Sequence, residues 1–280
     1  MIDRVIALLG PRPPRRLVRP SARRHVAGPE IVDACRLART LAGEGKLATI
    51  GPLGEDSSSV HEVAVYASEC RRALHELSGL GVGAALSVKL SALGLALDEE
   101  LCFERLSELV RAGAASETTV FIDMERSAAV DSTLGLYRRL REQSLGNAVL
   151  ALQARLRRTL ADVRALAPLE PRISLCKGAY DEPAELVYSN AAELRASFVS
   201  ILAELIASAS FVGIATSDLE LIGEAARMLA EADQRCHEFQ LLFGSTGGLD
   251  RELIGAGAPV RIYVPYGESW YDYTLRRLPR

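Results

Sequence analysis

Short apolar runs alternate with longer segments of helical periodicity along most of the chain. The runs are rich in Val, Ile, Leu and Ala and predict eight buried strands, at residues 47–51, 85–90, 119–124, 148–153, 172–176, 211–216, 238–242 and 260–264. Apolar residues at helical spacing predict helices at residues 101–111, 132–143, 183–207 and 219–232, and a further helix at residues 31–45 before the first strand. Eight βα units without a break in composition predict a parallel sheet closed into an α/β fold, a (β/α)₈ TIM-type barrel.

A doubly wound open sheet is the alternative architecture. Its dinucleotide-binding signature, GxGxxG directly after the first strand, is absent, because PLGED follows residues 47–51 and the pair Gly81 and Gly83 precedes a strand. The barrel is therefore the favoured fold. We expect residues 1–46 to form an N-terminal arm and helices, and residues 47–280 to form the barrel.

Charge and cysteine content exclude several classes of protein. The formal net charge of −3 gives no overall attraction to nucleic acid. Arginines crowd the first 24 residues between prolines, without interleaved aromatic residues, which is typical of a surface arm. Five scattered cysteines without a CxxC pair indicate a reducing compartment and argue against a zinc site. The apolar patch in residues 1–10 is too short to span a membrane, so we expect a cytoplasmic protein with at most peripheral membrane contact.

Polar residues follow most of the predicted strands at their carboxyl ends, where a barrel carries its active site. They are Lys89, Asp123, Glu125, Gln153, Lys177, Thr216, Ser217, Asp218 and Gln240. An ion pair inside the barrel would explain any one of them. Their coincidence, together with the step Gly178-Ala179-Tyr180, favours a site for a large anionic or polar cofactor, because small residues let the backbone approach a ligand.

Residues 260–280 predict a strand, a turn at Pro265 and Gly267, and a short helix. Arg276 and Arg277 lie near the end of that helix, and Tyr273 lies one turn before Arg277. Two adjacent guanidinium groups can hold a carboxylate through planar forks of donors. The same pair at a helix end is commonly a solvated group that compensates the helix dipole. The segment alone leaves both interpretations open.

Six segments resemble, in order, the signature segments of the proline dehydrogenase family of flavoenzymes. They are SVKLSALG at residues 87–94, IDME at 122–125, LQARLRRT at 152–159, LCKGAY at 175–180, EFQLLFG at 238–244 and RIYVPYGESWYDYTLRRL at 261–278. Each segment alone is weakly specific, but six in the same order are a strong signal. The resemblance implies a barrel with FAD along its carboxyl-terminal rim and the last helix over the active site.

The resemblance also implies roles for individual residues. Arg276 and Arg277 match the pair that binds the proline carboxylate, and Lys89 and Asp123 match residues beneath the substrate ring. The implied pocket walls are Tyr263, Tyr273 and Leu242. The residues implied around the flavin are Gln153, Arg172, Ser174, Lys177, Gly178, Ala179, Tyr180, Thr216, Ser217 and Gln240.

The reaction that the resemblance implies is removal of hydride from the carbon next to nitrogen. The substrate would be L-proline or a related cyclic or N-substituted amino acid, and the product an imine such as pyrroline-5-carboxylate. FAD would accept the hydride, and a quinone or another acceptor would then take the electrons.

Four positions depart from the family pattern. Ser174 stands where the family has arginine, Ser217 where it has histidine, Arg155 where it has tyrosine, and Arg280 where it has glutamate. Arg172 lies on the same strand face as Ser174 but matches a second arginine of related sequences. Because two changes lie on the flavin side, retention of FAD stays open. The alternatives are a divergent barrel with altered or lost flavin chemistry that binds an amino-acid-like carboxylate, in specialised metabolite biosynthesis, and a non-catalytic binding protein.

Overall fold

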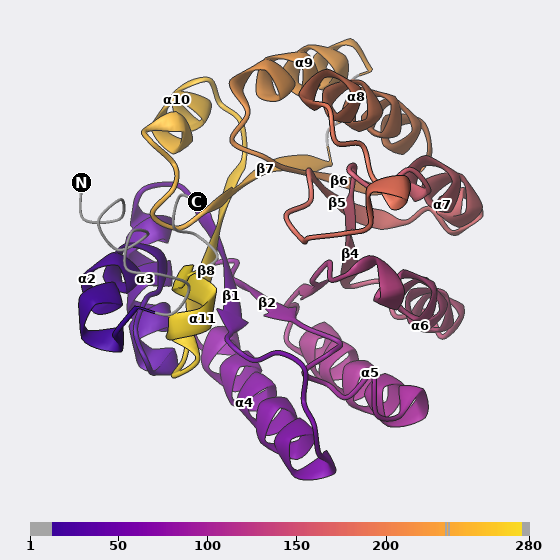
Figure 1. The fold of residues 1–280 in the computed structure, drawn as a ribbon. Helices are drawn as coiled ribbons and strands as arrows, with labels where there is room; N and C mark the ends of the chain where they lie inside the picture. The colour runs from indigo at the N-terminus through magenta and orange to yellow at the C-terminus, as the bar shows by residue number, and fades with distance from the viewer. Residues whose placement is uncertain (1–12, 233, 235, 276–280) are drawn as a thin grey trace.

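The computed structural model describes residues 13–232, 234 and 236–275 of the chain. A ring of strands is surrounded by helices, and the first and last described helices lie beside each other at one side of the ring (Figure 1). Arg276, Arg277 and Arg280, which the sequence singled out, lie outside the described residues.

All eight predicted strands are present, are parallel, and pair with their neighbours in chain order. They are β1 (Leu47–Pro52), β2 (Ala85–Val88), β3 (Val120–Ile122), β4 (Ala148–Gln153), β5 (Arg172–Cys176), β6 (Phe211–Ala215), β7 (His237–Leu242) and β8 (Val260–Tyr266). Strand β8 pairs with β1, from Leu47 opposite Arg261 to Pro52 opposite Tyr266, and so closes the sheet. The predicted α/β fold with a (β/α)₈ barrel is confirmed.

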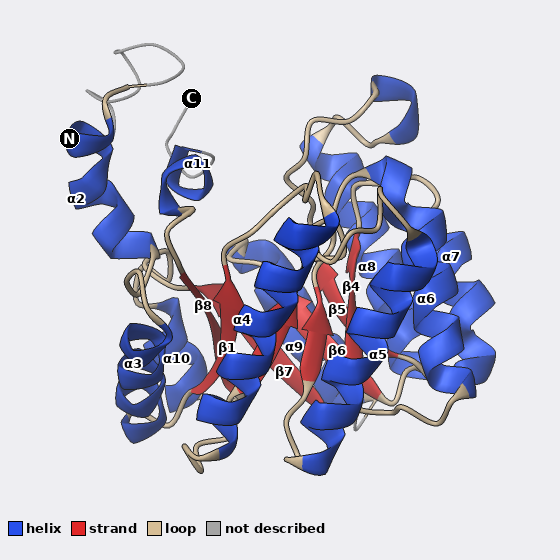
Figure 2. Ribbon diagram, turned by 90° about the horizontal axis from the view of Figure 1, so that it is seen from below, coloured by secondary structure: helices blue, strands red, loops and turns tan. Residues whose placement is uncertain are grey.

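A helix follows each strand, and most of these helices cover the outer face of the barrel (Figure 2). The helices are α2 (Arg15–His25), α3 (Ile31–Gly43), α4 (Val60–Ser78), α5 (Glu99–Ala115), α6 (Val130–Glu142), α7 (Thr159–Leu166), α8 (Ala191–Ser208), α9 (Leu219–Glu231), α10 (Leu249–Gly255) and α11 (Trp270–Leu275), with short 3₁₀ turns at η1 (Ser127–Ala129), η2 (Ala167–Leu169) and η3 (Ala184–Leu186). Within the described part of the chain, no helix combines the length and the apolar character needed to cross a membrane.

One predicted helix begins later than expected. The helix expected over residues 183–207 starts only at Ala191, because the Asn190 side chain caps it by accepting hydrogen bonds from two N–H groups of its first turn. The apolar residues before it belong to a loop, in which Val187 is buried and pairs with Leu156. Buried apolar residues in a loop can therefore show the same sequence spacing as a helix.

The last strand runs further than expected. Strand β8 continues through Pro265, which lies opposite Gly51 of β1. The turn begins only at Gly267, where φ is +124° and a glycine is required. The Pro265 carbonyl accepts a hydrogen bond of 2.9 Å from the Ala27 N–H, so a segment from the start of the chain supports this part of the strand.

Part of the expected N-terminal surface arm is helical. Helix α2 has weak local helix signals, because its first turn lacks an acidic residue and Pro20 lies inside it. Its Val18 is fully buried, so packing stabilises the helix. Its exposed face carries arginines, as the charge pattern indicates, while its buried face packs against α11.

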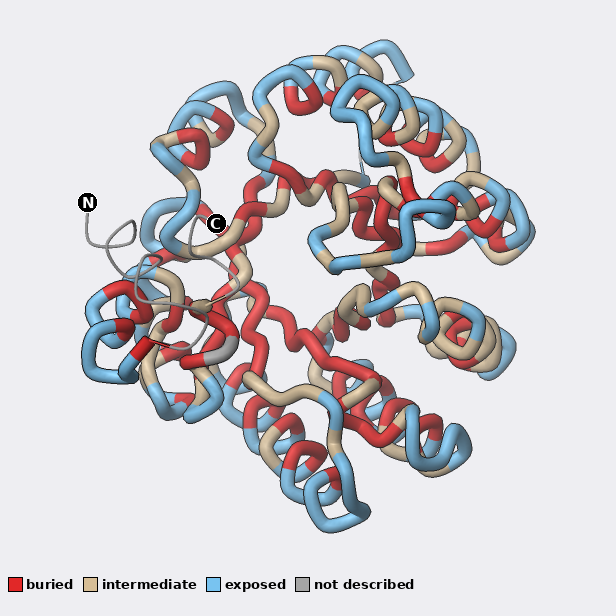
Figure 3. Tube along the Cα trace, viewed as in Figure 1, coloured by how far each residue is buried: buried red, intermediate tan, exposed pale blue. Residues whose placement is uncertain are grey.

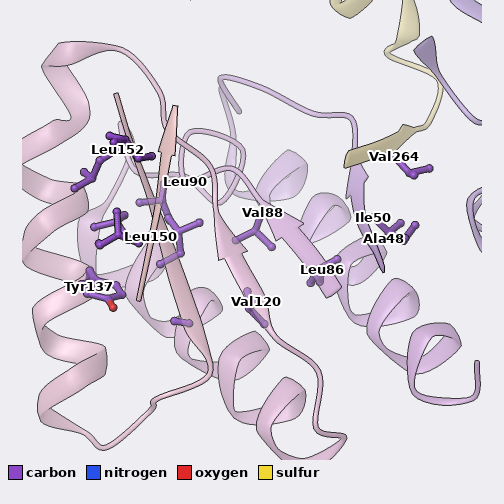
Figure 4. Close-up of a cluster of buried hydrophobic side chains, with 14 of the residues drawn as sticks. Ala48, Ile50, Leu86, Val88, Leu90, Val120, Tyr137, Leu150, Leu152 and Val264 are labelled. Atoms are coloured by element: carbon purple, nitrogen blue, oxygen red, sulfur yellow. The ribbon is translucent and has the colours of Figure 1, made fainter. Parts of the chain in front are cut away.

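Alternate residues along each strand face opposite sides of the sheet. Outward-facing residues such as Ile50, Val88 and Leu150 form the main apolar core (Figure 4). Buried positions follow the barrel wall, and exposed positions lie on the outer sides of the helices (Figure 3). The inward-facing positions remain available for polar side chains.

The inside of the barrel is filled at the amino-terminal ends of the strands. Ala85, Phe121, Val149 and Phe211 form an apolar cluster there. The guanidinium groups of Arg172 and Arg261 lie 5.1 Å and 5.4 Å from the ring centres of Phe211 and Phe121. We call this layer the barrel floor, and it leaves the carboxyl-terminal rim as the end where a ligand can enter.

Candidate active site

The rim ends of β2, β3 and β8 bring together three residues that the sequence singled out. Lys89 Nζ donates to Asp123 Oδ2 at 2.9 Å, and the Tyr263 hydroxyl donates to the same oxygen at 3.5 Å. Ser87 donates its hydroxyl to the other carboxylate oxygen, Oδ1. Asp123 therefore accepts hydrogen bonds from three side chains, two from β2 or its end and one from β8, which together fix its orientation.

Lys89 lies 8% exposed beside this carboxylate. Burial by itself lowers the pKa of the Lys89 ammonium, but Asp123, with Tyr263 and Tyr180, outweighs burial and raises the pKa well above its ordinary value. Lys89 therefore stays protonated at physiological pH. It provides a permanent positive charge at the rim and cannot act there as a base.

Glu125 connects this group to Gln153. The Glu125 carboxylate accepts hydrogen bonds from the Ser91 N–H, at 2.8 Å, and from the Ser91 hydroxyl. Its main-chain carbonyl accepts a hydrogen bond of 3.3 Å from Gln153 Nε2. Burial raises the pKa of Glu125, and the Ser91 hydrogen bonds partly offset that rise. Glu125 thus holds the loop after β2 through its side chain and Gln153 through its backbone.

The other end of the Gln153 amide is unpaired. Gln153 is 1% exposed, and its Oε1 has no hydrogen-bond partner among the described residues. Gly178, with φ +100°, lies against it so closely that a Cβ there would be 2.5 Å from Oε1. Because a buried acceptor without a partner is costly, this oxygen is a candidate contact for a bound group.

Ser174 is joined to a chain of polar side chains inside the barrel. Its hydroxyl donates to Gln240 Oε1 at 2.5 Å. Gln240 Nε2 in turn donates to Glu238 at 2.8 Å, and Arg261 Nε donates to the same carboxylate at 2.6 Å. Both ends of the Gln240 amide are therefore fixed. Arg172 lies below Ser174 in the barrel floor, away from the rim.

A second polar group lies at the rim ends of β5 and β6. The Asp218 carboxylate accepts hydrogen bonds from Lys177 Nζ and Arg195 Nε, each at 3.0 Å. Burial alone would raise the pKa of Asp218, but Arg195 and Lys177 outweigh it and lower the pKa to about 2. An open hollow here is lined by Lys177, Arg195, Thr216, Ser217, Asp218, Leu219 and Glu220.

The remaining candidate residues are spread around the rim. Leu242 ends β7 and lies opposite Tyr263 in the strand ladder. Ala179 and Tyr180 lie in the loop after β5, where Arg155 donates to the Tyr180 carbonyl at 3.0 Å. Tyr273 is buried on α11. The structure thus joins Lys89, Asp123 and Tyr263 directly and places Lys177, Thr216 and Ser217 in a separate group.

Several residues that shape the site carry only a weak signal in the sequence. A Cβ on Gly51 would be 2.5 Å from the Tyr263 hydroxyl oxygen, and one on Gly213 would overlap the Gln240 amide. A glycine inside a predicted strand is the available signal, since it often marks a close approach. Arg195 gives no signal, because it lies within an ordinary helical pattern and only the fold brings it to Asp218.

A model of the family described as proline dehydrogenase matches residues 34–279. The chain belongs to the proline dehydrogenase family. Proline dehydrogenase 1 of Bacillus subtilis (strain 168) is 34% identical over 263 residues, covering 92% of this chain and 85% of the relative. Proline dehydrogenase of Deinococcus radiodurans is 30% identical over 263 residues, with the same two coverages of 92% and 85%. These names identify the proline dehydrogenase family as oxidoreductases and support proline oxidation.

Solved structures share the barrel of this proline dehydrogenase family member. Proline utilization A (PutA) from Bdellovibrio bacteriovorus, inactivated by N-propargylglycine, superposes with a TM-score of 0.87 at 20% identity, covering 94% of this chain and 33% of that chain. PutA from Bradyrhizobium japonicum gives a TM-score of 0.78 at 22% identity, covering 94% and 30%. The chain spans about a third of these larger proteins. The likeness shows a shared fold.

Proposed function

We propose that this protein oxidises L-proline, or a related cyclic or N-substituted amino acid, at the carbon next to nitrogen. FAD would be the hydride acceptor, and an imine such as pyrroline-5-carboxylate the product. The observation that best supports the proposal is the direct contact of Lys89, Asp123 and Tyr263 at the open end of the barrel. Residues 47–280 would be the catalytic unit.

The residues on the opposite side of the rim fit a flavin. Gln153 Oε1 is a buried acceptor that lacks a partner among the described residues, and Gly178 lets the main chain lie against it, where a Cβ would come within 2.5 Å of that oxygen. A flavin ring carries an N–H group, and such an oxygen can accept a hydrogen bond from it. The residues we propose to hold the cofactor are Gln153, Ser174, Lys177, Gly178, Ala179, Tyr180, Thr216, Ser217 and Gln240.

The substrate side would work through fixed charges. The substrate amine must lose its extra proton before hydride can leave the neighbouring carbon, and the permanently protonated Lys89 cannot take that proton. Lys89 instead has N–H groups left to donate to the substrate carboxylate, and we propose that Arg276 and Arg277 also bind this carboxylate.

The walls of the pocket would orient the ring. Tyr263, Tyr273 and Leu242 would exclude water and hold the ring in a reactive position. A bound FAD would accept the hydride and pass the electrons to a quinone or another acceptor.

Flavin content tests the proposal directly. Protein purified by gel filtration should absorb in the flavin bands, and L-proline should bleach these bands under anaerobic conditions. L-Alanine, which lacks the ring, is the control and should bleach them far more slowly. A colourless protein that does not take up added FAD would contradict the redox part of the proposal.

A carboxylate-binding barrel with altered or lost flavin chemistry is the second candidate. The observation that favours it concerns Ser174, whose hydroxyl is already used by Gln240, so that a neutral side chain stands where the family pattern has an arginine. Calorimetry separates the two candidates. Binding of L-proline by a protein that takes up no FAD would favour the second.

A further inference from the structure

Helix α11 is packed mainly against α2. Among the described elements, α2 has the most extensive contact with α11, and two views show these helices side by side (Figures 1 and 2). Val18 of α2 and Tyr271 of α11 are buried together, with Trp270 and Leu275 packed against them. This small cluster is separate from the main core. The position of α11 therefore depends on α2.

Arg15 adds a charged contact across the same interface. Its guanidinium carbon lies 5.6 Å from the Trp270 ring centre and 5.3 Å from the Tyr271 ring centre. The two rings pack edge to face, with their centres 5.9 Å apart. A cation over an aromatic face is attracted by its π electrons. The Tyr271 hydroxyl also donates to the Pro13 carbonyl, immediately before α2.

The two helices are also joined at their bases. The Ala27 N–H donates to the Pro265 carbonyl, and the Gly267 N–H donates to the Gly28 carbonyl, each at 2.9 Å. The segment after α2 and the segment before α11 thus share one hydrogen-bonded junction at the end of β8. A displacement of α2 would therefore be transmitted to α11 through these two hydrogen bonds.

We propose that Arg15 and Val18 are positioning residues for the substrate pocket, because they hold α11, and with it Tyr273, at the rim. The inference rests on the proposed function, in which Tyr273 lines the pocket. Tyr273 is buried two residues beyond Tyr271 on the same six-residue helix. A helix this short is unstable without packing, and α2 supplies that packing. Arg15 and Val18 act through α11 and do not touch the substrate.

Trp270 provides a direct readout of this contact, because it is the only tryptophan in the sequence. Arg15→Met removes the cation, keeps the aliphatic stem, and should increase acrylamide quenching of Trp270 roughly twofold. Arg15→Lys keeps a cation and should restore most of the protection. Arg16→Met is the matched control, since Arg16 is exposed and has no hydrogen bond, ion pair or ring contact with the described residues.

The effect on the pocket is measured separately, in the FAD-loaded protein. The rate of anaerobic flavin reduction at increasing L-proline concentration gives a half-saturating concentration and a limiting rate. Arg15→Met should raise the half-saturating concentration roughly three- to tenfold. The limiting rate should stay unchanged, because Lys89, Asp123 and Tyr263 are untouched. Arg15→Lys should recover much of the loss, and Arg16→Met should match the wild type.

Each outcome decides one point. Unchanged quenching in Arg15→Met overturns the contact between the helices, and increased quenching with an unchanged half-saturating concentration overturns the positioning role. Should Arg15→Met fail to fold, Val18→Ala gives the same two readouts. A wild-type protein that does not oxidise proline contradicts the proposed function instead, and the quenching comparison still decides whether α2 holds α11.

Discussion

The hydroxyl of Tyr263 lies directly over Gly51 of the neighbouring strand. A Cβ on Gly51 would be 2.5 Å from the hydroxyl oxygen and 2.8 Å from the ring carbon that carries it. This missing side chain lets Tyr263 reach Asp123, at 3.5 Å. A glycine in β1 therefore sets the position of an aromatic side chain on β8.

Gly51→Ala should displace Tyr263 from the site. The added methyl group overpacks the inner face, so we expect a loss of about 1–3 kcal/mol in the free energy of unfolding and weaker L-proline binding. Gly135→Ala is the matched control, because nothing lies within 4 Å of a Cβ there, and in the middle of α6 it should stabilise by about 0.5–1 kcal/mol. Urea denaturation and anaerobic titration measure both effects. Unchanged stability and proline binding in Gly51→Ala would show that Tyr263 does not need this glycine.

Lys89→Met should abolish proline-dependent flavin reduction and destabilise the protein. It leaves the Asp123 carboxylate half-buried without its cation, at a cost of about 3–5 kcal/mol, whereas Lys89→Met with Asp123→Asn should recover stability but not activity. Lys46→Met breaks a comparable buried pair with Asp250, 2.5 Å long, just before β1 at the opposite end of the barrel. That control should lose stability and keep its half-saturating proline concentration. Normal flavin reduction by Lys89→Met would show that Lys89 does not take part in the reaction.

The double change Ser174→Arg and Ser217→His should strengthen FAD binding. Ser174 is a neutral residue whose hydroxyl is used by Gln240, whereas an arginine at 174 would add a permanent positive charge and further N–H donors on the proposed flavin side, and a charged hydrogen bond to the cofactor contributes about 1.5–3 kcal/mol. Fluorescence titration with FAD should therefore show at least a tenfold lower dissociation constant. Ser217→His alone is the control. An unchanged dissociation constant in the double variant means that these positions do not limit flavin binding.

Asp218→Asn should lower stability near neutral pH but not in acid. The Asp218 pKa of about 2 lies below the ordinary value of about 3.9 expected in the unfolded chain. Between these values the unfolded state binds more protons, so the contribution is complete above about pH 4 and is lost as pH falls towards 2. We expect a difference of about 1 kcal/mol at pH 7.

The control for Asp218 is Asp131→Asn, because Asp131 is 83% exposed in its pair with Arg158. Its effect at pH 7 should be smaller. Urea denaturation from pH 2 to 7 compares the two variants. A stability difference for Asp218→Asn that does not change with pH would contradict this account.

The fold follows from local patterns, and those patterns have clear limits. Strand apolarity predicts all eight strands because parallel strands are buried on both faces. Periodicity fails over residues 183–190, where Val187 is buried although it lies in a loop and not in the helix that starts at Ala191. It also fails at Pro265, because a proline that usually ends a strand pairs here across from Gly51. Both errors arise from contacts with distant parts of the chain.

The candidate site is predictable in composition but not in its connections. Strand ends identify Lys89 and Asp123 as rim residues before any contact is known. The hydrogen bond between Ser174 and Gln240 spans 66 positions in the sequence, and no local pattern encodes it. Arg195 likewise reaches Asp218 only because α8 and α9 pack together. The relative positions of the site side chains are therefore set by contacts between residues far apart in the sequence.

The barrel floor leaves the carboxyl-terminal rim as the side from which a molecule can approach the inside of the barrel. Phe121 and Phe211, with Arg261 and Arg172 stacked on their rings, close the far end. In the proposed function, the amino acid, its oxidised product and an electron acceptor would then all reach and leave the site from the rim. They would then bind in turn, so that release of the oxidised product would have to precede binding of the electron acceptor.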